Sequence, residues 1–270
     1  MLKTRALTAA VLLAAFGAAL FLLPQLGWIV FCAALLGAAA WEWGGLAALS
    51  VPGRCAYTVF QVLLFLVLVL GGPRAGGLYG PIWAYYLSGL FWLTIAPLWI
   101  WGKYRYARPS LLGVGFLMLP AAGAALVDLR AGHPALLLAV MGTVWISDSA
   151  AYFVGRRFGK RKLAPSISPG KTWEGVAGAL VAVALYALAW AALGTPENRW
   201  VGADGNAPAF AAVLLGLAVV GIIGDLFESL IKRQAGVKDS GTLLPGHGGI
   251  LDRIDAPVAV LPLAVLAFMR

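Results

Sequence analysis

The chain has 270 residues, of which 61% are hydrophobic and only 11% are charged, and its formal net charge is +9. Soluble domains carry about 25% charged residues, so this composition excludes a single soluble core and predicts an integral membrane protein. The positive charge does not require a nucleic-acid partner, because Lys and Arg gather in the cytoplasmic loops of membrane proteins. The two cysteines, Cys32 and Cys55, show neither a disulfide framework nor metal-ligand spacing.

Apolar segments of membrane-spanning length follow one another along the chain. Because a spanning helix needs about 20 apolar residues, we predict nine spans, at 6–23, 26–48, 56–72, 80–101, 110–128, 134–155, 174–194, 207–231 and 251–269. The first is longer than the roughly 7–15 apolar residues of a signal peptide, so we expect it to remain in the protein. The second is interrupted by Glu42.

The expected fold is an all-α, polytopic integral membrane protein with about nine transmembrane helices. We expect a single transmembrane domain, 1–270. Within it, 1–130 are expected to form scaffold and lipid-facing helices, and 131–270 are expected to carry the functional cytoplasmic loops.

The distribution of basic residues predicts the orientation of these spans. With nine spans, 16 of the 20 Lys and Arg residues fall on the side of the N-terminus. The other 4 are Arg74, Arg130, Arg199 and Arg270. The positive-inside rule places the basic side in the cytoplasm, so we expect a multi-pass protein of the inner (cytoplasmic) membrane whose functional loops face the cytoplasm.

Ionisable residues inside predicted spans are the first candidates for function, because they are costly in a membrane and therefore rare. Asp148 lies about two turns from the basic end of span 134–155. The alternative for Asp148 is a buried carboxylate that accepts hydrogen bonds from neighbouring hydroxyl groups.

The end of span 207–231 carries a polar face at spacings of three and four residues, which align side chains on a helix. The members of this face are Asp225, Glu228, Ser229 and Lys232. A simple Glu228–Lys232 ion pair would explain Glu228, but it does not explain Asp225, which lies a turn deeper. Gly221 and Gly224 would let the backbone of another helix approach closely.

The last span begins with the stretch "GHGGILDRID", residues 246–255. Asp252 and Asp255 face the same way on a helix, and like charges at this spacing repel, so we expect a positive group beside them. One alternative is the helix N-terminus, which favours acidic residues, with Arg253 as the local partner. The other is a site for a hard cation that also uses Asp225, since Mg²⁺ takes carboxylate oxygens together with phosphates and water.

Basic residues lie between and beside these acids. Lys232, Arg233 and Lys238 follow one acid cluster, and the loop "GRRFGKRKLAPSISPGK" precedes span 174–194. Membrane topology and attraction to anionic lipids explain most of the loop. Carboxylates that hold a metal next to Lys, Arg and glycine-rich backbone are nevertheless typical of phosphate chemistry, in which cations neutralise phosphoryl oxygens.

The segment 170–172, Gly-Lys-Thr, looks like the end of a nucleotide-binding P-loop. That motif needs another Gly five residues earlier and a preceding strand, but position 165 is Pro and a membrane span comes first. We therefore exclude a nucleoside-triphosphatase. Ser168 and Pro169 are predicted to form a turn from which Lys171 reaches a phosphate; an ordinary loop lysine is the alternative.

His247 lies among glycines in the same stretch as the last acid pair. It can act as a base, as a donor to phosphate or as an exposed bystander, and these alternatives stay open. Zinc binding is not expected, because the other histidine, His133, is predicted on the far side of the membrane.

The segment "SLIKRQAGVKDSGTLLPGHGGILDRID", residues 229–255, resembles the signature of the phosphatidate cytidylyltransferases (CDP-diacylglycerol synthases). The matching positions are Ser229, Lys232, Arg233, Lys238, Asp239, Gly241, Pro245, His247, Gly248, Gly249, Asp252, Arg253 and Asp255. "SDSAAYFVGRRFGK" and "SPGKTWEG" resemble other segments of the family more loosely. These motifs lie within residues 147–255.

The resemblance implies that CTP and phosphatidate react to give CDP-diacylglycerol and pyrophosphate in phospholipid biosynthesis. It also implies Mg²⁺, allows a second ion such as K⁺, and predicts an all-helical membrane homodimer with no nucleic-acid partner. The resemblance further implies a polar cavity that faces the cytoplasm, with dimer contacts from 1–130 and the catalytic motifs in 131–270. The expected metal ligands are Asp225 and Asp252, with Asp148. The expected catalytic residues are Asp225, Asp252, Lys232 and Asp255. The expected substrate-binding residues are Ser168, Lys171, Ser229, Arg233, Lys238, Asp239, His247, Gly248, Gly249 and Arg253.

Two other functions are considered. A related CTP-dependent lipid transferase or polyprenol kinase is the nearer one. A membrane transporter also uses intramembrane acids, but transporters usually show paired broken helices in two repeated halves. This chain shows no repeat, and its acids gather toward one end.

Overall fold

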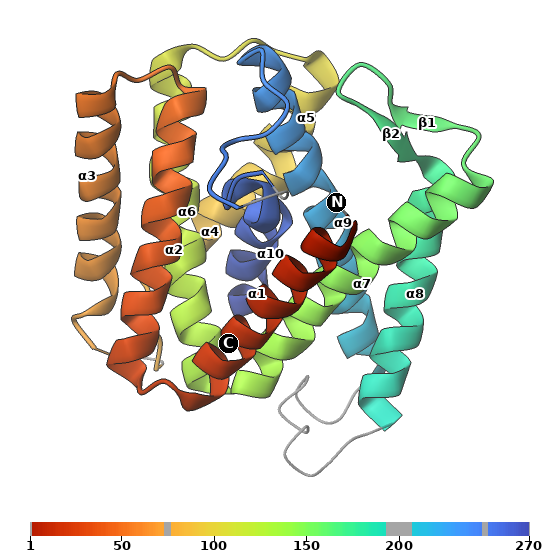
Figure 1. Ribbon diagram of the computed structural model, residues 1–270. Helices are drawn as coiled ribbons and strands as arrows, with labels where there is room; N and C mark the ends of the chain where they lie inside the picture. The colour runs from red at the N-terminus through yellow and green to blue at the C-terminus, as the bar shows by residue number, and fades with distance from the viewer. Residues whose placement is uncertain (1, 73–76, 193–206, 245–247, 270) are drawn as a thin grey trace.

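The protein is a bundle of helices (Figure 1), and a computed structural model describes residues 2–72, 77–192, 207–244 and 248–269. The helices are α1 (Leu2–Leu22), α2 (Gln25–Leu46), α3 (Val51–Val69), α4 (Ile82–Leu90), the π-helix η1 (Phe91–Ile95), α5 (Ala96–Gly102), α6 (Arg108–Gly132), α7 (Pro134–Phe158), α8 (Trp173–Ala192), α9 (Ala207–Gln234) and α10 (Leu251–Phe268). Two short strands, β1 (Lys162–Ala164) and β2 (Ser168–Thr172), form a hairpin between α7 and α8. The predicted all-α class is confirmed.

In the part of the chain that the structure describes, seven helical segments are long and apolar enough to cross a membrane, and α4, η1 and α5 together form one of them, Ile82–Gly102. The chain is therefore a multi-pass membrane protein. The remaining two predicted spans fold as α1 and α10. Helix α1 has 21 residues, and α10 carries three charged residues in its first two turns. The count of nine spans stays a prediction.

Large apolar side chains remain exposed on the outside of the bundle, as expected for helices that face lipid. Examples are Phe21, Leu63, Val67, Leu98 and Leu185. Association of helices in lipid depends on close packing rather than on escape from water. Small residues accordingly occupy the centre of α6, the most buried of the seven segments: a Cβ added at Gly123 would lie 3.1 Å from Leu36 and from Phe65.

The same principle brings α9 and α10 together. A Cβ added at Gly224 would lie 2.7 Å from the carbonyl oxygen of Asp255 and 2.9 Å from Ala259. One added at Gly221 would lie 3.4 Å from Val260. The prediction that these two glycines admit another helix backbone is confirmed.

The link between α7 and α8 is an antiparallel hairpin. Its register pairs Lys162 with Thr172 and Ala164 with Ser168. The predicted turn at Ser168 and Pro169 is wrong, because both residues lie in β2 and the turn is formed by 165–167. The buried Ile167 closes that turn by donating its N–H to Ala164. Pro169 is tolerated because a two-stranded hairpin leaves one edge of each strand without a partner.

The hairpin is fixed to the start of α8. The Glu174 carboxylate accepts hydrogen bonds from the backbone N–H groups of Lys160, at 3.1 Å, and Arg161, at 3.2 Å. Thr172 accepts from the N–H of Gly175 at 3.1 Å, which satisfies one of the free donors at the helix start. The residues of β2 are therefore held in a defined position relative to the bundle.

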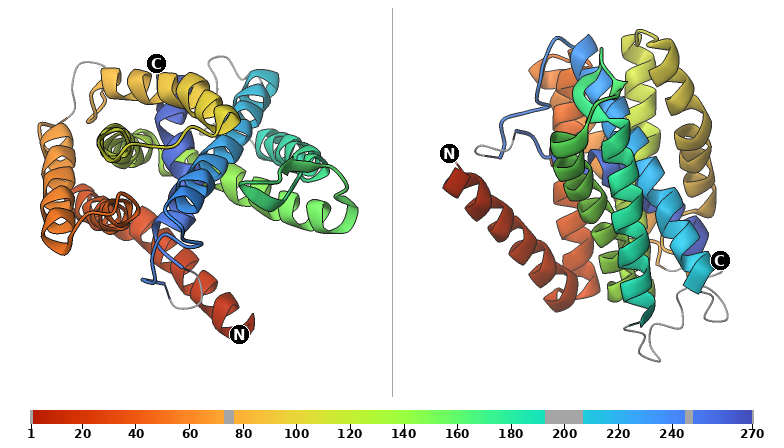
Figure 2. Two further views of the ribbon diagram at one scale, coloured as in Figure 1. Left: turned by 90° about the horizontal axis from the view of Figure 1, so that it is seen from above. Right: turned by 90° about the vertical axis from the view of Figure 1, so that its right-hand side faces the viewer.

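The segment after α9 turns back into the bundle, and α10 begins there among the other helices (Figure 1). Seen from above, α9 crosses the middle of the molecule, and α1 diverges from the body in both views (Figure 2). This arrangement places the charged first turn of α10 inside the protein rather than at its rim.

Candidate active site

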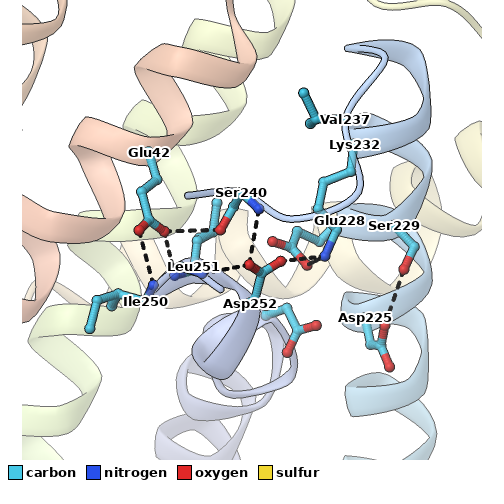
Figure 3. A network of polar contacts seen from close by, with 12 residues as sticks. Glu42, Asp225, Glu228, Ser229, Lys232, Val237, Ser240, Ile250, Leu251 and Asp252 are labelled. Atoms are coloured by element: carbon cyan, nitrogen blue, oxygen red, sulfur yellow. Dashed lines mark hydrogen bonds and ion pairs between the residues drawn. The ribbon is translucent and has the colours of Figure 1, made fainter. Parts of the chain in front are cut away.

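The polar face predicted at the end of α9 is present (Figure 3). Ser229 donates its hydroxyl proton to Asp225 at 3.3 Å, and the Lys232 ammonium group lies 2.7 Å from Glu228. Both contacts join residues four apart on the helix, and Glu228 and Lys232 are buried. The predicted Glu228–Lys232 pair is confirmed.

Asp252, in the first turn of α10, meets this face across the interface of α9 and α10. Its Oδ1 lies 2.5 Å from the Lys232 ammonium group, and its Oδ2 accepts from the backbone N–H groups of Ser240, at 2.9 Å, and Gly249, at 2.8 Å. The positive group expected beside Asp252 is therefore Lys232. Gly248 has a φ of +82°, which favours glycine.

The hairpin contributes Lys171 to the same cluster. Its ammonium group lies 2.5 Å from Asp225 Oδ2, and both side chains are partly exposed. Arg233 is exposed and donates from Nε to the carbonyl of Ile167 in the hairpin turn, at 3.3 Å. Strand β2 thus brings a lysine to an acid that lies 54 residues later in the sequence (225 − 171 = 54).

Asp148, Arg253 and Asp255 line one cavity, which Asp252 also lines. Asp148 is exposed there, so the alternative of a buried carboxylate among hydroxyl groups is wrong. Asp255 is within electrostatic range of Asp225, Glu228 and Asp148. Carboxylates from three helices, α7, α9 and α10, therefore share one region, although their sequence positions differ widely.

Lys238 and Asp239 are exposed in the segment between α9 and α10. Asp239 lies beside Asp252, because a Cβ added at Gly248 would approach both side chains, at 3.3 Å and 2.7 Å. Ser168 pairs with Ala164 inside the hairpin rather than with the acid cluster. His247 lies outside the described residues.

Sequence reasoning did not assign a role to Glu42, although its charge inside a predicted span was visible. Glu42 is only 1% exposed and belongs to α2. It accepts hydrogen bonds from Ser240 Oγ at 2.9 Å, from the N–H of Ile250 at 3.0 Å and from the N–H of Leu251 at 2.8 Å. Ile250 and Leu251 directly precede Asp252 in the sequence, and Ser240 donates its N–H to Asp252, so Glu42 borders the site.

The cavity lined by Asp148, Asp252 and Asp255 has a volume of about 620 Å³. Its lining comes from α1, α2, α6, α7 and α10 and is mostly apolar; examples are Phe16, Leu36, Leu119, Trp145 and Leu261. Its polar end is formed by Asp148, Ser149, Asp252, Arg253 and Asp255. Small-molecule sites commonly have volumes of about 300–1,000 Å³ and few polar groups. The cavity therefore suits an amphipathic ligand with its charged end at the carboxylates.

The model of a family described as "Cytidylyltransferase family" matches residues 3–269. The chain belongs to the cytidylyltransferase family. It is 41% identical to a phosphatidate cytidylyltransferase of Pseudomonas aeruginosa over 97% of this chain and 95% of the relative. It is 38% identical to one of Haemophilus influenzae over 97% and 96%, and 37% identical to one of Brucella suis over 67% and 72%. The resemblance seen in residues 147–255 extends to nearly the whole chain.

The carboxylates of this cytidylyltransferase have the chemistry of a hard-cation site. Within the described residues, no three His, Cys, Asp or Glu side chains are already arranged around a common metal position. Mg²⁺ needs only one or two protein carboxylates when phosphates and water complete its shell. Glu228 Oε1 is buried and has no hydrogen-bond partner in the described part of the chain. The carboxylate cluster therefore contains a buried oxygen, Glu228 Oε1, that can accept a further contact, and this fits a bound cation.

Proposed function

We propose that this protein is a phosphatidate cytidylyltransferase, which transfers the CMP group of CTP to phosphatidate and so produces CDP-diacylglycerol and pyrophosphate. Family membership and the names of the relatives support this activity. The observation that carries it in the structure is the continuity of the cavity, which joins a charged end at Asp252 and Arg253 to an apolar lining from five helices. A lipid phosphate matches both parts.

The reaction forms one P–O bond and breaks another. A phosphate oxygen of phosphatidate attacks the α-phosphorus of CTP, the bond to the oxygen that bridges to the β-phosphorus breaks, and pyrophosphate leaves with the electron pair. The lipid phosphate is already anionic, so no strong general base is required. The main difficulty is to bring two polyanions together and to stabilise charge on the phosphoryl oxygens.

Lys232 and Lys171 supply positive charge for this purpose. Lys232 is held between Glu228 and Asp252, and Lys171 is held by Asp225. Ammonium groups fixed in this way need no reorganisation as charge develops, which is the basis of electrostatic catalysis. Arg233, Lys238, Ser229 and the N–H groups near Gly248 are proposed to bind the phosphates of the two substrates.

Asp225 and Asp252, with Asp148, are proposed to hold Mg²⁺. A second ion such as K⁺ is proposed to share the site. When bound, Mg²⁺ would supply Lewis-acid neutralisation of phosphoryl oxygens. The carboxylates also orient the two lysines through ion pairs of 2.5 to 2.7 Å.

We also propose the setting of the reaction. The basic loops at the end of the bundle that bears the hairpin favour a cytoplasmic site, which is where CTP is available. Phosphatidate would enter from the inner membrane, and the protein would act as a homodimer.

The activity is tested with purified protein in lipid nanodiscs supplied with phosphatidate, Mg²⁺ and CTP labelled at the α-phosphorus. We expect label in a lipid product together with one pyrophosphate per product, and loss of both on addition of EDTA. The absence of labelled lipid would contradict the proposal. Transfer of label or of the γ-phosphate to polyprenol derivatives, with none to phosphatidate, would instead support the related lipid transferase or kinase.

A further inference from the structure

The buried carboxylate of Glu42 joins the N-terminal helices to the site (Figure 3). It reaches Ser240, Ile250 and Leu251, which lie 198, 208 and 209 residues later in the chain. These contacts join α2 to the segment that leads into α10. Two of the contacted residues, Ile250 and Leu251, directly precede Asp252 in the sequence.

The start of α10 explains why a carboxylate is needed there. The first N–H groups of a helix have no partner within the helix, and an unpaired buried N–H is costly. Ile250, the residue that precedes α10, has no polar side chain to cap them. Glu42 from α2 accepts from Ile250 and Leu251 instead, and its negative charge is favourable at a helix N-terminus.

Ser240 connects Glu42 to the site. Its hydroxyl donates to Glu42 Oε2 at 2.9 Å, and its backbone N–H donates to Asp252 Oδ2 at 2.9 Å. One residue therefore bridges the two carboxylates. A displacement of Glu42 would release the hydroxyl of Ser240 and move the N–H that orients Asp252.

The glycines around Glu42 leave little freedom for the carboxylate. A Cβ added at Gly249 would overlap with Glu42 Oε2 and with Ser240 Oγ, and one added at Gly241 would overlap with Glu42 Oε1. Gly249 also donates its N–H to Asp252. The close approach of Gly249 to Glu42 and its hydrogen bond to Asp252 belong to one packed arrangement.

We propose that Glu42 is a positioning residue for the cytidylyl transfer. It fixes Ser240, Ile250 and Leu251 so that Asp252 stays aligned with Lys232. This inference rests on the proposed function, because alignment matters only if the reaction takes place at Asp252 and Lys232.

The test uses Glu42→Gln with a matched control. Asp128 of α6 is also a fully buried carboxylate that accepts from two backbone N–H groups, those of Tyr79 and Gly80, and from one hydroxyl, that of Tyr85. Asp128→Asn therefore removes the same kind of acceptor away from the site. We expect kcat of Glu42→Gln to fall at least tenfold, with the KM values for both substrates changed less than threefold, and kcat of Asp128→Asn to stay within twofold of wild type.

Two further measurements test the inference, and the first keeps it testable if Glu42→Gln folds poorly. Ser240→Ala removes the bridging hydroxyl and leaves both carboxylates, and we expect a threefold to tenfold loss of kcat. Hydrogen exchange of peptides covering 248–256 should rise in Glu42→Gln and not in Asp128→Asn, whether or not the protein turns over CTP.

Unchanged kcat in Ser240→Ala, or equal losses of kcat in Glu42→Gln and Asp128→Asn, would overturn the positioning role and leave a structural one. Unchanged exchange at 248–256 in Glu42→Gln would also overturn it. Failure of the proposed function has a different signature: the wild-type protein itself would form no CDP-diacylglycerol, while the exchange measurement would still report on the contact.

Discussion

Glu42 and Asp128 accept hydrogen bonds from the same kinds of donor but lie in different surroundings. Each is buried, and each accepts from two backbone N–H groups and one hydroxyl. The donors to Asp128 precede or begin α4, at the end of the bundle away from the hairpin (Figure 1). The donors to Glu42 belong to the segment that also holds Asp252.

The comparison teaches that a buried acid in a membrane protein is not in itself a sign of catalysis. Glu42 satisfies backbone donors at the start of α10, and Asp128 satisfies those of Tyr79 and Gly80 in the segment before α4; both are structural tasks. What distinguishes the Glu42 end is the group of ion pairs next to it, Lys232 with Glu228 and Asp252, and Lys171 with Asp225. The predictions below test whether function follows this difference.

The largest effect is expected for Asp252→Asn. The amide would keep the size of the side chain but would lose the charge that faces Lys232 and one of the acceptors used by Ser240 and Gly249. We expect kcat to fall about 100-fold or more, the size typical for loss of a preorganised electrostatic contact. The measurement is CDP-diacylglycerol formation per folded protein, with folding checked by gel filtration in detergent. Activity near that of wild type would remove Asp252 from the site.

Lys232→Met is expected to affect both activity and stability. It leaves Glu228 and Asp252 without their common partner in a buried position. Loss of one member of a buried ion pair costs about 3–5 kcal/mol, so the protein should unfold at markedly lower temperature and lose turnover. Arg105→Met, at an exposed loop position, serves as the control and should change stability by less than about 0.5 kcal/mol. Equal melting temperatures for the two variants would contradict the buried pairing.

The sequence predicted the helices well because their signals are local. Eight of the nine predicted spans start within four residues of the corresponding helix, and the remaining one, 56–72, starts at Val51 instead. There Ser50 accepts from the N–H of Gly53 and Pro52 lies in the first turn, signals that extend a helix beyond its apolar stretch. The polar face of α9 was predicted for the same reason, since spacings of three and four residues define a helix face.

The parts that could not be predicted depend on contacts distant in the sequence. Glu42 was seen only as an interruption of a span, because its partners lie about 200 residues away and no local spacing indicates them. Lys171 was expected at a phosphate, but its pairing with Asp225 required the position of the hairpin. Local reasoning also placed the turn at Ser168 and Pro169, whereas the burial of Ile167 sets it three residues earlier.

Lys171→Ala should separate catalysis from stability. Lys171 and Asp225 are 23% and 30% exposed, and such ion pairs contribute about 0–1 kcal/mol. We therefore expect an almost unchanged melting temperature together with a roughly tenfold lower kcat, because one positive charge leaves the site. Lys162→Ala, an exposed change in the partner strand β1, controls for the hairpin and should leave kcat within twofold. Equal activities of the two variants would show that Lys171 serves only the fold.

Tyr85→Phe tests the surroundings of Asp128, where the smallest effect on activity is expected. It removes the hydroxyl donor of Asp128 but leaves the backbone donors from Tyr79 and Gly80. A hydrogen bond to a charged group contributes about 1.5–3 kcal/mol, so thermal stability in detergent should fall while kcat stays within twofold. A large fall of kcat without loss of stability would mean that the Asp128 end is coupled to the reaction. Function would then not follow from the ion pairs beside Glu42 alone, and a buried carboxylate at either end of the bundle would have to be treated as part of the catalytic apparatus.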